Sequence, residues 1–152
     1  MTAVRISRDA LDQARRFFEE RGSHGHEGTA MIASSTANGS CRLVIPDQRA
    51  GVAPTCWVEV TQAGKLQLAS ALGVDDRYVA RIHSHPMDAF HSRTDDINPA
   101  ITFEGAVSIV APYFGLGLRH GLDACAVFVR RAGHWIELPP GSMRNQTLEI
   151  TT

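Results

Sequence analysis

The stretch RIHSHPMDAFHSRTDD, residues 81–96, gathers three histidines and three aspartates around one proline. Alternate residues of a β-strand point to the same side, so His83 and His85 would share one face of a strand that Pro86 ends. Two imidazoles on one face can hold a metal ion, and a catalytic zinc needs a third ligand and an open position for water. The carboxylates in reach for that third position are Asp88, Asp95 and Asp96.

The same composition also suits a hydrophilic surface loop, so a His-x-His pair alone is a weak signal. Two features favour the metal site. An apolar strand, expected at 77–85, leads into the pair, and a Ser-x-x-Asp pattern follows at 92–95.

These residues resemble a known motif. HSHP at 83–86 followed by SRTD at 92–95 is similar to the signature of the JAMM metalloproteases (the MPN+ or JAB domain), which is His-x-His-Pro, a short spacer and Ser-x-x-Asp. That family also has an upstream glutamate before a strand, with a glycine or small residue three positions later. HEGTAMIAS at 26–34 supplies Glu27 and Ala30, so two separated motifs agree and the resemblance covers most of the chain.

The resemblance implies a role for each matching residue. His83, His85 and Asp95 would hold Zn²⁺, and the fourth position would hold water whose pKa the metal lowers towards about 7. Glu27 would take the proton of that water as general base and pass it to the leaving amine. Ser92 would donate a hydrogen bond to the developing oxyanion.

The spacer departs from the family pattern. Five residues separate Pro86 from Ser92, where the family has six or seven. Asp95 keeps the Ser-x-x-Asp spacing and is the expected ligand, whereas Asp96 better preserves the distance from His85 and is the alternative.

Other interpretations of single residues remain. Glu27 also reads as an exposed loop glutamate, and Ser92 as the N-cap of a helix starting at Arg93. We interpret His91 as a rim residue. The remaining histidines have no partner in sequence or lie in a solvated loop: His24, His26, His120 and His134.

The 152 residues suit one domain spanning 1–152, with 43% hydrophobic and 20% charged residues. A formal net charge of −1 gives no electrostatic reason to expect a nucleic-acid or membrane partner. No apolar run is long enough to span a bilayer, and the N-terminus lacks the apolar core of a signal peptide, so we expect a cytoplasmic protein. The cysteines Cys41, Cys56 and Cys125 are scattered, which argues against disulfides and a cysteine zinc site.

Elements that would position the site follow from periodicity and turn signals. Ser7 is expected to cap a helix reaching about Arg21, and a second helix is expected at 61–73. The tail 139–152 is weakly patterned. Strands are expected at 29–35, 41–46, 56–60, 77–85, 106–112, 124–131 and 134–138, a loop at 47–55, and a short or broken helix at 94–105. The mix predicts an α+β fold of mixed α/β layers. The resemblance implies a JAMM/MPN-like arrangement, with a curved, mostly antiparallel central sheet flanked by helices.

The resemblance further implies hydrolysis of peptide or isopeptide bonds. The first expectation is a ubiquitin-like modifier or its conjugates as substrate, with E1-like and E2-like proteins as system partners. An alternative is a peptidase that frees a sulfur-carrier protein from cysteine or amino-acid adducts. A non-catalytic MPN scaffold is a third class, against which the complete set of motif residues argues. Substrate-binding residues are not predicted.

Overall fold

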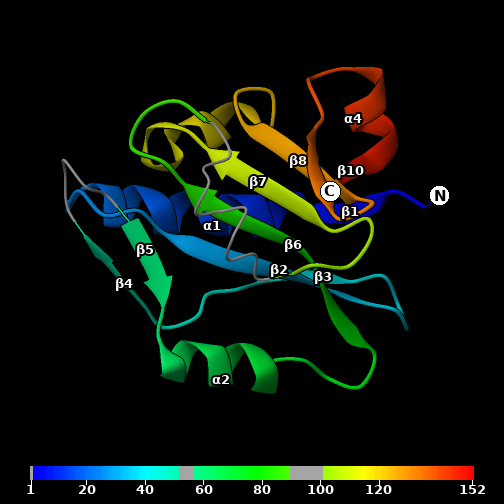
Figure 1. The fold of residues 1–152 in the computed structure, drawn as a ribbon, viewed down its shortest axis with the longest axis horizontal. Helices are drawn as coiled ribbons and strands as arrows, with labels where there is room; N and C mark the ends of the chain where they lie inside the picture. Colours follow the sequence, from blue (N-terminus) through cyan, green and yellow to red (C-terminus); the bar gives the residue numbers. More distant parts are fainter. Residues whose placement is uncertain (1, 52–56, 90–100) are drawn as a thin grey trace.

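The computed structural model describes residues 2–51, 57–89 and 101–152 (Figure 1). Its centre is a six-stranded sheet with the order β3-β2-β6-β7-β8-β9. β6 and β7 run parallel, and every other neighbouring pair in this sheet is antiparallel. The prediction of an α+β fold with a mostly antiparallel sheet is therefore confirmed. The strands are β2 (Thr29–Ser35), β3 (Cys41–Val44), β6 (Asp76–Ser84), β7 (Val107–Ala111), β8 (Ala126–Arg131) and β9 (His134–Glu137).

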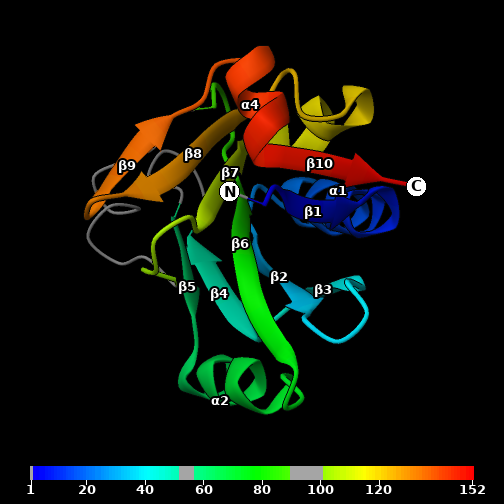
Figure 2. The same ribbon diagram turned by 90° about the vertical axis from the view of Figure 1, so that its right-hand side faces the viewer.

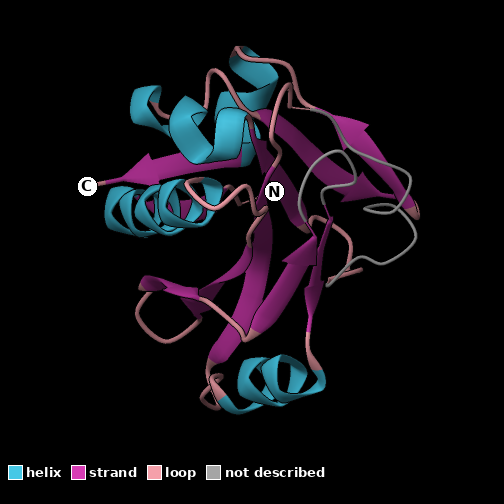
Figure 3. Cartoon of the chain, turned by 90° about the vertical axis from the view of Figure 1, so that its left-hand side faces the viewer, coloured by secondary structure: helices cyan, strands magenta, loops and turns pink. Residues whose placement is uncertain are grey.

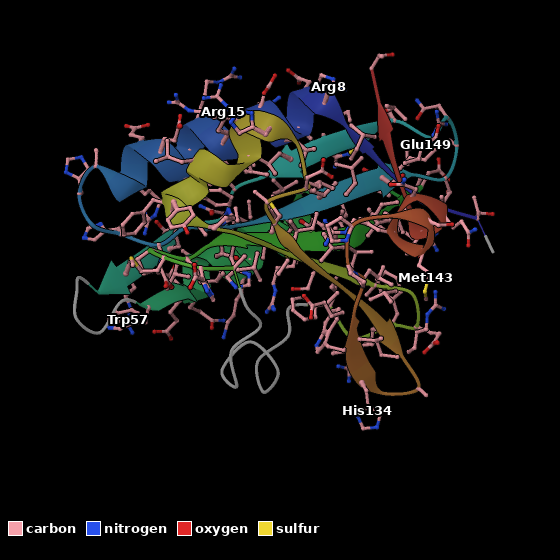
Figure 4. All side chains as sticks on the ribbon, turned by 90° about the horizontal axis from the view of Figure 1, so that it is seen from above. Arg8, Arg15, Trp57, His134, Met143 and Glu149 are labelled. Carbon is pink, nitrogen blue, oxygen red and sulfur yellow. The ribbon has the colours of Figure 1, made fainter. Side chains whose placement is uncertain are left out.

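Helix α1 (Arg8–Gly22) lies along one face of this sheet, beside the 3-10 segment η1 (Tyr113–His120) (Figure 4). As predicted, Ser7 caps α1, because its hydroxyl accepts a hydrogen bond from the Ala10 N–H at 3.1 Å. The core lies between helix and sheet. Its largest fully buried side chains include Phe18 from α1 and Ile32, Ile82, Ile109 and Val127 from the strands.

A smaller two-stranded sheet leads to the second helix, which lies away from α1 (Figure 2). β4 (Gln48–Gly51) pairs antiparallel with β5 (Trp57–Val60), so the loop predicted at 47–55 was wrong over its first residues. The helix predicted after it is confirmed as α2 (Gln62–Ser70), which Thr61 caps through the Gly64 N–H at 3.0 Å. Of the helices in the described ranges, none has the length and apolarity to cross a membrane.

The last residues form a helix and a strand, although their sequence pattern is weak (Figure 3). They form α4 (Ser142–Thr147) and β10 (Leu148–Thr151), and β10 pairs in parallel with β1 (Val4–Ser7). Arg144, in α4, connects this tail to the core. Its buried guanidinium donates to the backbone carbonyls of Leu138, Leu122 and Cys125 at 2.8, 2.7 and 3.2 Å.

Other sequence predictions met different outcomes. The hairpin between β8 and β9 turns at Ala132 and Gly133, with φ of +49° and +80°, as expected for a tight turn. Most of the broken helix predicted at 94–105 lies outside the described residues, and its described part, 101–105, contains no helix. Cys125 is a buried free thiol and Cys41 a half-buried one, where both were expected to be buried, and Cys56 lies outside the described ranges. Burial raises the pKa of the Cys125 thiol to about 12, so this residue is no nucleophile at neutral pH.

Replacing Arg144 with Met should lower the free energy of unfolding by about 2–5 kcal/mol, because buried carbonyls lose charged donors. Urea unfolding followed by circular dichroism measures this. Arg16→Met, on the exposed side of α1, is the control and should change stability by less than about 0.5 kcal/mol. Equal effects of the two substitutions would contradict the role given to Arg144.

Candidate metal centre

The histidine pair lies at the end of β6, in the middle of the main sheet. His83 and His85 are 4% and 6% exposed, and their rings lie side by side with centroids 5.0 Å apart. Their Nε2 atoms approach to 3.2 Å. The alternation of the strand therefore brings two imidazole nitrogens to one point.

This separation fits two ligands of one zinc ion. Two nitrogens that each lie about 2.0–2.1 Å from a tetrahedral zinc are about 3.3 Å apart. The 3.2 Å distance also suits a hydrogen bond between the two rings when no metal is present. A metal and that hydrogen bond would compete for the same two nitrogens, because the metal needs a lone pair on each and the hydrogen bond needs a proton on one of them. The donor set is of the kind that a zinc site needs, and the two rings are already convergent.

Ser84, between the two histidines, fastens the strand end to the segment that carries Glu27. Its hydroxyl accepts a hydrogen bond from the Gly28 N–H and its own N–H donates to the Gly28 carbonyl, both at 2.9 Å. The antiparallel register pairs Thr29 with His83. Continued by two residues, this register sets Glu27 opposite His85. Glu27 is half-buried.

Gly28 is required by the close approach of helix α1. A Cβ at this position would lie 2.8 Å from Phe18 Cδ1 and 3.1 Å from Phe17 Cε1. A larger residue would therefore push the segment 27–29 away from its place against β6.

Two further side chains hold this segment, and no local sequence pattern indicates either contact. The Arg21 Nε donates to the Glu27 carbonyl at 2.8 Å. The Gln48 side chain brackets the backbone of Thr29, accepting from its N–H at 2.8 Å and donating to its carbonyl at 2.9 Å. The sequence pattern predicts a loop at Gln48, and the contact with Thr29, 19 residues away, forms only in the folded chain.

His85 and the residues after it are hydrogen-bonded to the end of β7 and to the turn that follows it. The His85 N–H donates to the Ala111 carbonyl at 2.9 Å, and the Phe114 N–H donates to the His85 carbonyl at 2.7 Å. Tyr113 contributes its N–H to the Met87 carbonyl at 2.9 Å and its hydroxyl to Asp88 Oδ1 at 3.2 Å. This contact with the Asp88 carboxylate raises the pKa of the Tyr113 hydroxyl. Asp88 is thus already engaged by Tyr113.

A buried arginine lies on the same strand, two residues before His83. Arg81 is 6% exposed, pairs with Ser108 in the register of β6 and β7, and donates to the Ser108 hydroxyl at 3.2 Å. Burying a guanidinium is costly unless other groups compensate its charge. Arg81 and His83 are two positions apart on β6, so their side chains lie on the same side of the sheet. The positive charge of Arg81 there would attract carboxylate groups.

The remaining predicted site residues, Ser92, Asp95 and the alternative Asp96, lie outside the described residues, as does His91. Within the described ranges, no three His, Cys, Asp or Glu side chains gather as a metal-binding group. His24 and His26, just before Glu27, have their ring centroids 6.4 Å apart. The histidine pair and the Glu27 segment are therefore what the described part of the site contains, and the third ligand and the serine stay predictions.

Comparison with known proteins bears on what this pair does. No protein-family model matches the chain. The solution structure of protein DSY2949 from Desulfitobacterium hafniense superposes with a TM-score of 0.60, covering 97% of this chain and 92% of that chain at 11% identity, which shows a shared fold alone. A protein of Sinorhizobium fredii (strain NBRC 101917 / NGR234), named probable metalloprotease y4jG, is 30% identical over 147 residues, which cover 90% of this chain and 87% of that protein. At this identity and coverage, the chain belongs to the same family as the probable metalloprotease y4jG.

Proposed function

We propose that the protein is a zinc-dependent peptidase of the JAMM type. The observation that carries the proposal is the 3.2 Å approach of the His83 and His85 Nε2 atoms at a buried strand end. The Glu27 segment fastened beside them, the Ser-x-x-Asp pattern that follows, and the name of the Sinorhizobium relative all support it.

In this proposal, His83, His85 and Asp95 hold the zinc, and Asp96 is the alternative to Asp95. Bound zinc with one open position would lower the pKa of water to about 7 and polarise the carbonyl to be cut. Glu27 accepts a proton from the attacking water as the water oxygen bonds to the carbonyl carbon. It then delivers this proton to the amine nitrogen as the C–N bond breaks. Ser92 donates a hydrogen bond to the carbonyl oxygen as it gains charge.

For the substrate we propose a ubiquitin-like modifier, as a precursor or as a conjugate, with E1-like and E2-like proteins of the same system as partners. This rests on the motif resemblance, and fold does not fix substrate. Release of a sulfur-carrier protein from an amino-acid adduct uses the same bond chemistry. Mass spectrometry of modifier precursors, conjugates and carrier adducts incubated with the enzyme separates these substrates.

Protein purified without added metal should contain close to one zinc per chain by elemental analysis. His85→Ala should lose this zinc, because one of two converging imidazoles is removed. His134→Ala, an exposed histidine on β9, is the control and should keep it. Zinc retained by the double variant His83→Ala/His85→Ala would refute the site.

Glu27→Gln should keep the zinc and the fold but lower the hydrolysis rate by about 10²–10⁴-fold, because a positioned proton acceptor is lost while the ligands remain. Rates are compared on whichever substrate the mass spectrometry identifies. Glu20→Gln, an exposed glutamate near the end of α1, is the matched control and should leave the rate unchanged. Wild-type turnover by Glu27→Gln would mean that another group is the base.

Asp95→Ala should strip or strongly weaken zinc binding, whereas Asp96→Ala should leave zinc bound. If Ser92 begins a helical turn, Asp95 lies three positions on and on the same side, and Asp96 is rotated by about a further 100°. Parallel zinc titrations of the two variants measure the difference. Loss of zinc by Asp96→Ala alone would mean that the motif is shifted by one residue. Arg93 would then take the family's serine position, and the hydrogen-bond donor to the oxyanion would have to be another group.

A further inference from the structure

Three consecutive residues after β7 have left-handed backbone conformations, and two of them are not glycine. The φ angles are +54° at Tyr113, +52° at Phe114 and +90° at Gly115. This conformation costs free energy for residues with a Cβ, and such strain persists only where surrounding contacts impose it. Tyr113 is 48% exposed, so packing of its own side chain does little to compensate.

The turn of residues 113–115 presents its N–H groups to the strand end that carries the histidines. The Phe114 N–H reaches the His85 carbonyl at 2.7 Å, and the Tyr113 N–H reaches the Met87 carbonyl at 2.9 Å. The strained backbone therefore holds the carbonyl groups of the two residues that flank Pro86. The position of His85 depends on where this turn lies.

The last turn of helix α1 sets that position. A Cβ at Gly22 would overlap with Phe114 Cβ, and one at Gly115 would lie 2.6 Å from Phe18 Cβ. Both approaches are closer than two side chains allow, so helix and turn meet through glycines. Figure 4 shows α1 and η1 lying side by side over the sheet.

The same helical turn also holds the other side of the site. Arg21, next to Gly22, donates to the Glu27 carbonyl at 2.8 Å. Two adjacent helix residues therefore contact both segments that the proposed reaction must bring together.

We infer that the Gly22 end of α1 sets the position of the proposed ligand His85, with Gly22 and Phe114 as positioning residues, while the adjacent Arg21 holds the Glu27 segment. The inference rests on the proposed zinc site. It makes the absence of a side chain at Gly22 a requirement of the metal geometry, in addition to any role in packing.

The test is Gly22→Ala, measured with metal alone. Alanine is a better helix former than glycine, so a purely local helix effect would not weaken the protein. The new Cβ instead meets a Cβ of Phe114 that cannot swing aside. Zinc affinity should fall by about 10–100-fold, the size of effect seen when ligand-orienting groups are lost. The visible spectrum of the Co²⁺-substituted protein should change shape, because the ligand geometry changes.

The double variant Gly22→Ala/Phe114→Gly should restore both readouts, since it removes the clashing Cβ and glycine adopts φ near +52° without strain. Gly115→Ala displaces the same turn through Phe18 and should weaken zinc binding even if Gly22→Ala does not fold. Gly121→Ala is its matched control: its φ is +80°, but no atom lies within 4 Å of the added Cβ, so zinc binding should be unchanged.

A wild-type protein that binds no zinc would refute the proposed function and this inference together. A wild-type protein that binds zinc, with unchanged affinity and Co²⁺ spectrum in Gly22→Ala and Gly115→Ala, would overturn the inference and leave the proposed function standing. Loss of affinity without rescue in the double variant would also overturn it, because the contact between residues 22 and 114 would not be the cause.

Discussion

Two hydrogen bonds between Ser84 and Gly28 join the end of β6 to the entry of β2, and much of the site depends on them. Ser84 is fully buried, so breaking either bond would leave a polar group without water to replace its partner. The two hydrogen bonds hold Gly28 between the sheet and α1, where an added Cβ would lie 2.8 Å from Phe18 Cδ1. The link thereby holds the register of β6 against the segment 27–29, and the alternation of the strand puts the histidines on one side and Ser84 on the other.

Local rules in the sequence predicted the elements that form this link. The alternation around Ser84 predicted which side each histidine takes, and the Ser7 cap predicted where α1 begins. Both depend on residues within a few positions of each other. The spacing of the motif likewise singled out Glu27, whose backbone segment the register sets opposite His85.

The parts that sequence reasoning missed depend on contacts between distant residues. Nothing near Gln48 indicates that its amide brackets Thr29, and nothing near Leu148 indicates that β10 will find β1. The turn at Tyr113 has no glycine at its first two positions, so no turn rule predicts it. For such features the local pattern is overridden by tertiary structure, and only the assembled fold reveals them.

The parallel pairing of β6 and β7 has a topological consequence for how this family can vary. Two antiparallel strands can be joined by two residues, but a parallel neighbour obliges the chain to travel back the whole length of the strand before re-entering the sheet. The connection that leaves His85 is therefore one that the fold cannot delete. The pairing of the two strands sets neither the length nor the sequence of this connection. A spacer shorter than the common pattern is the kind of change that such an obligatory connection tolerates, since the sheet fixes where the connection begins and ends.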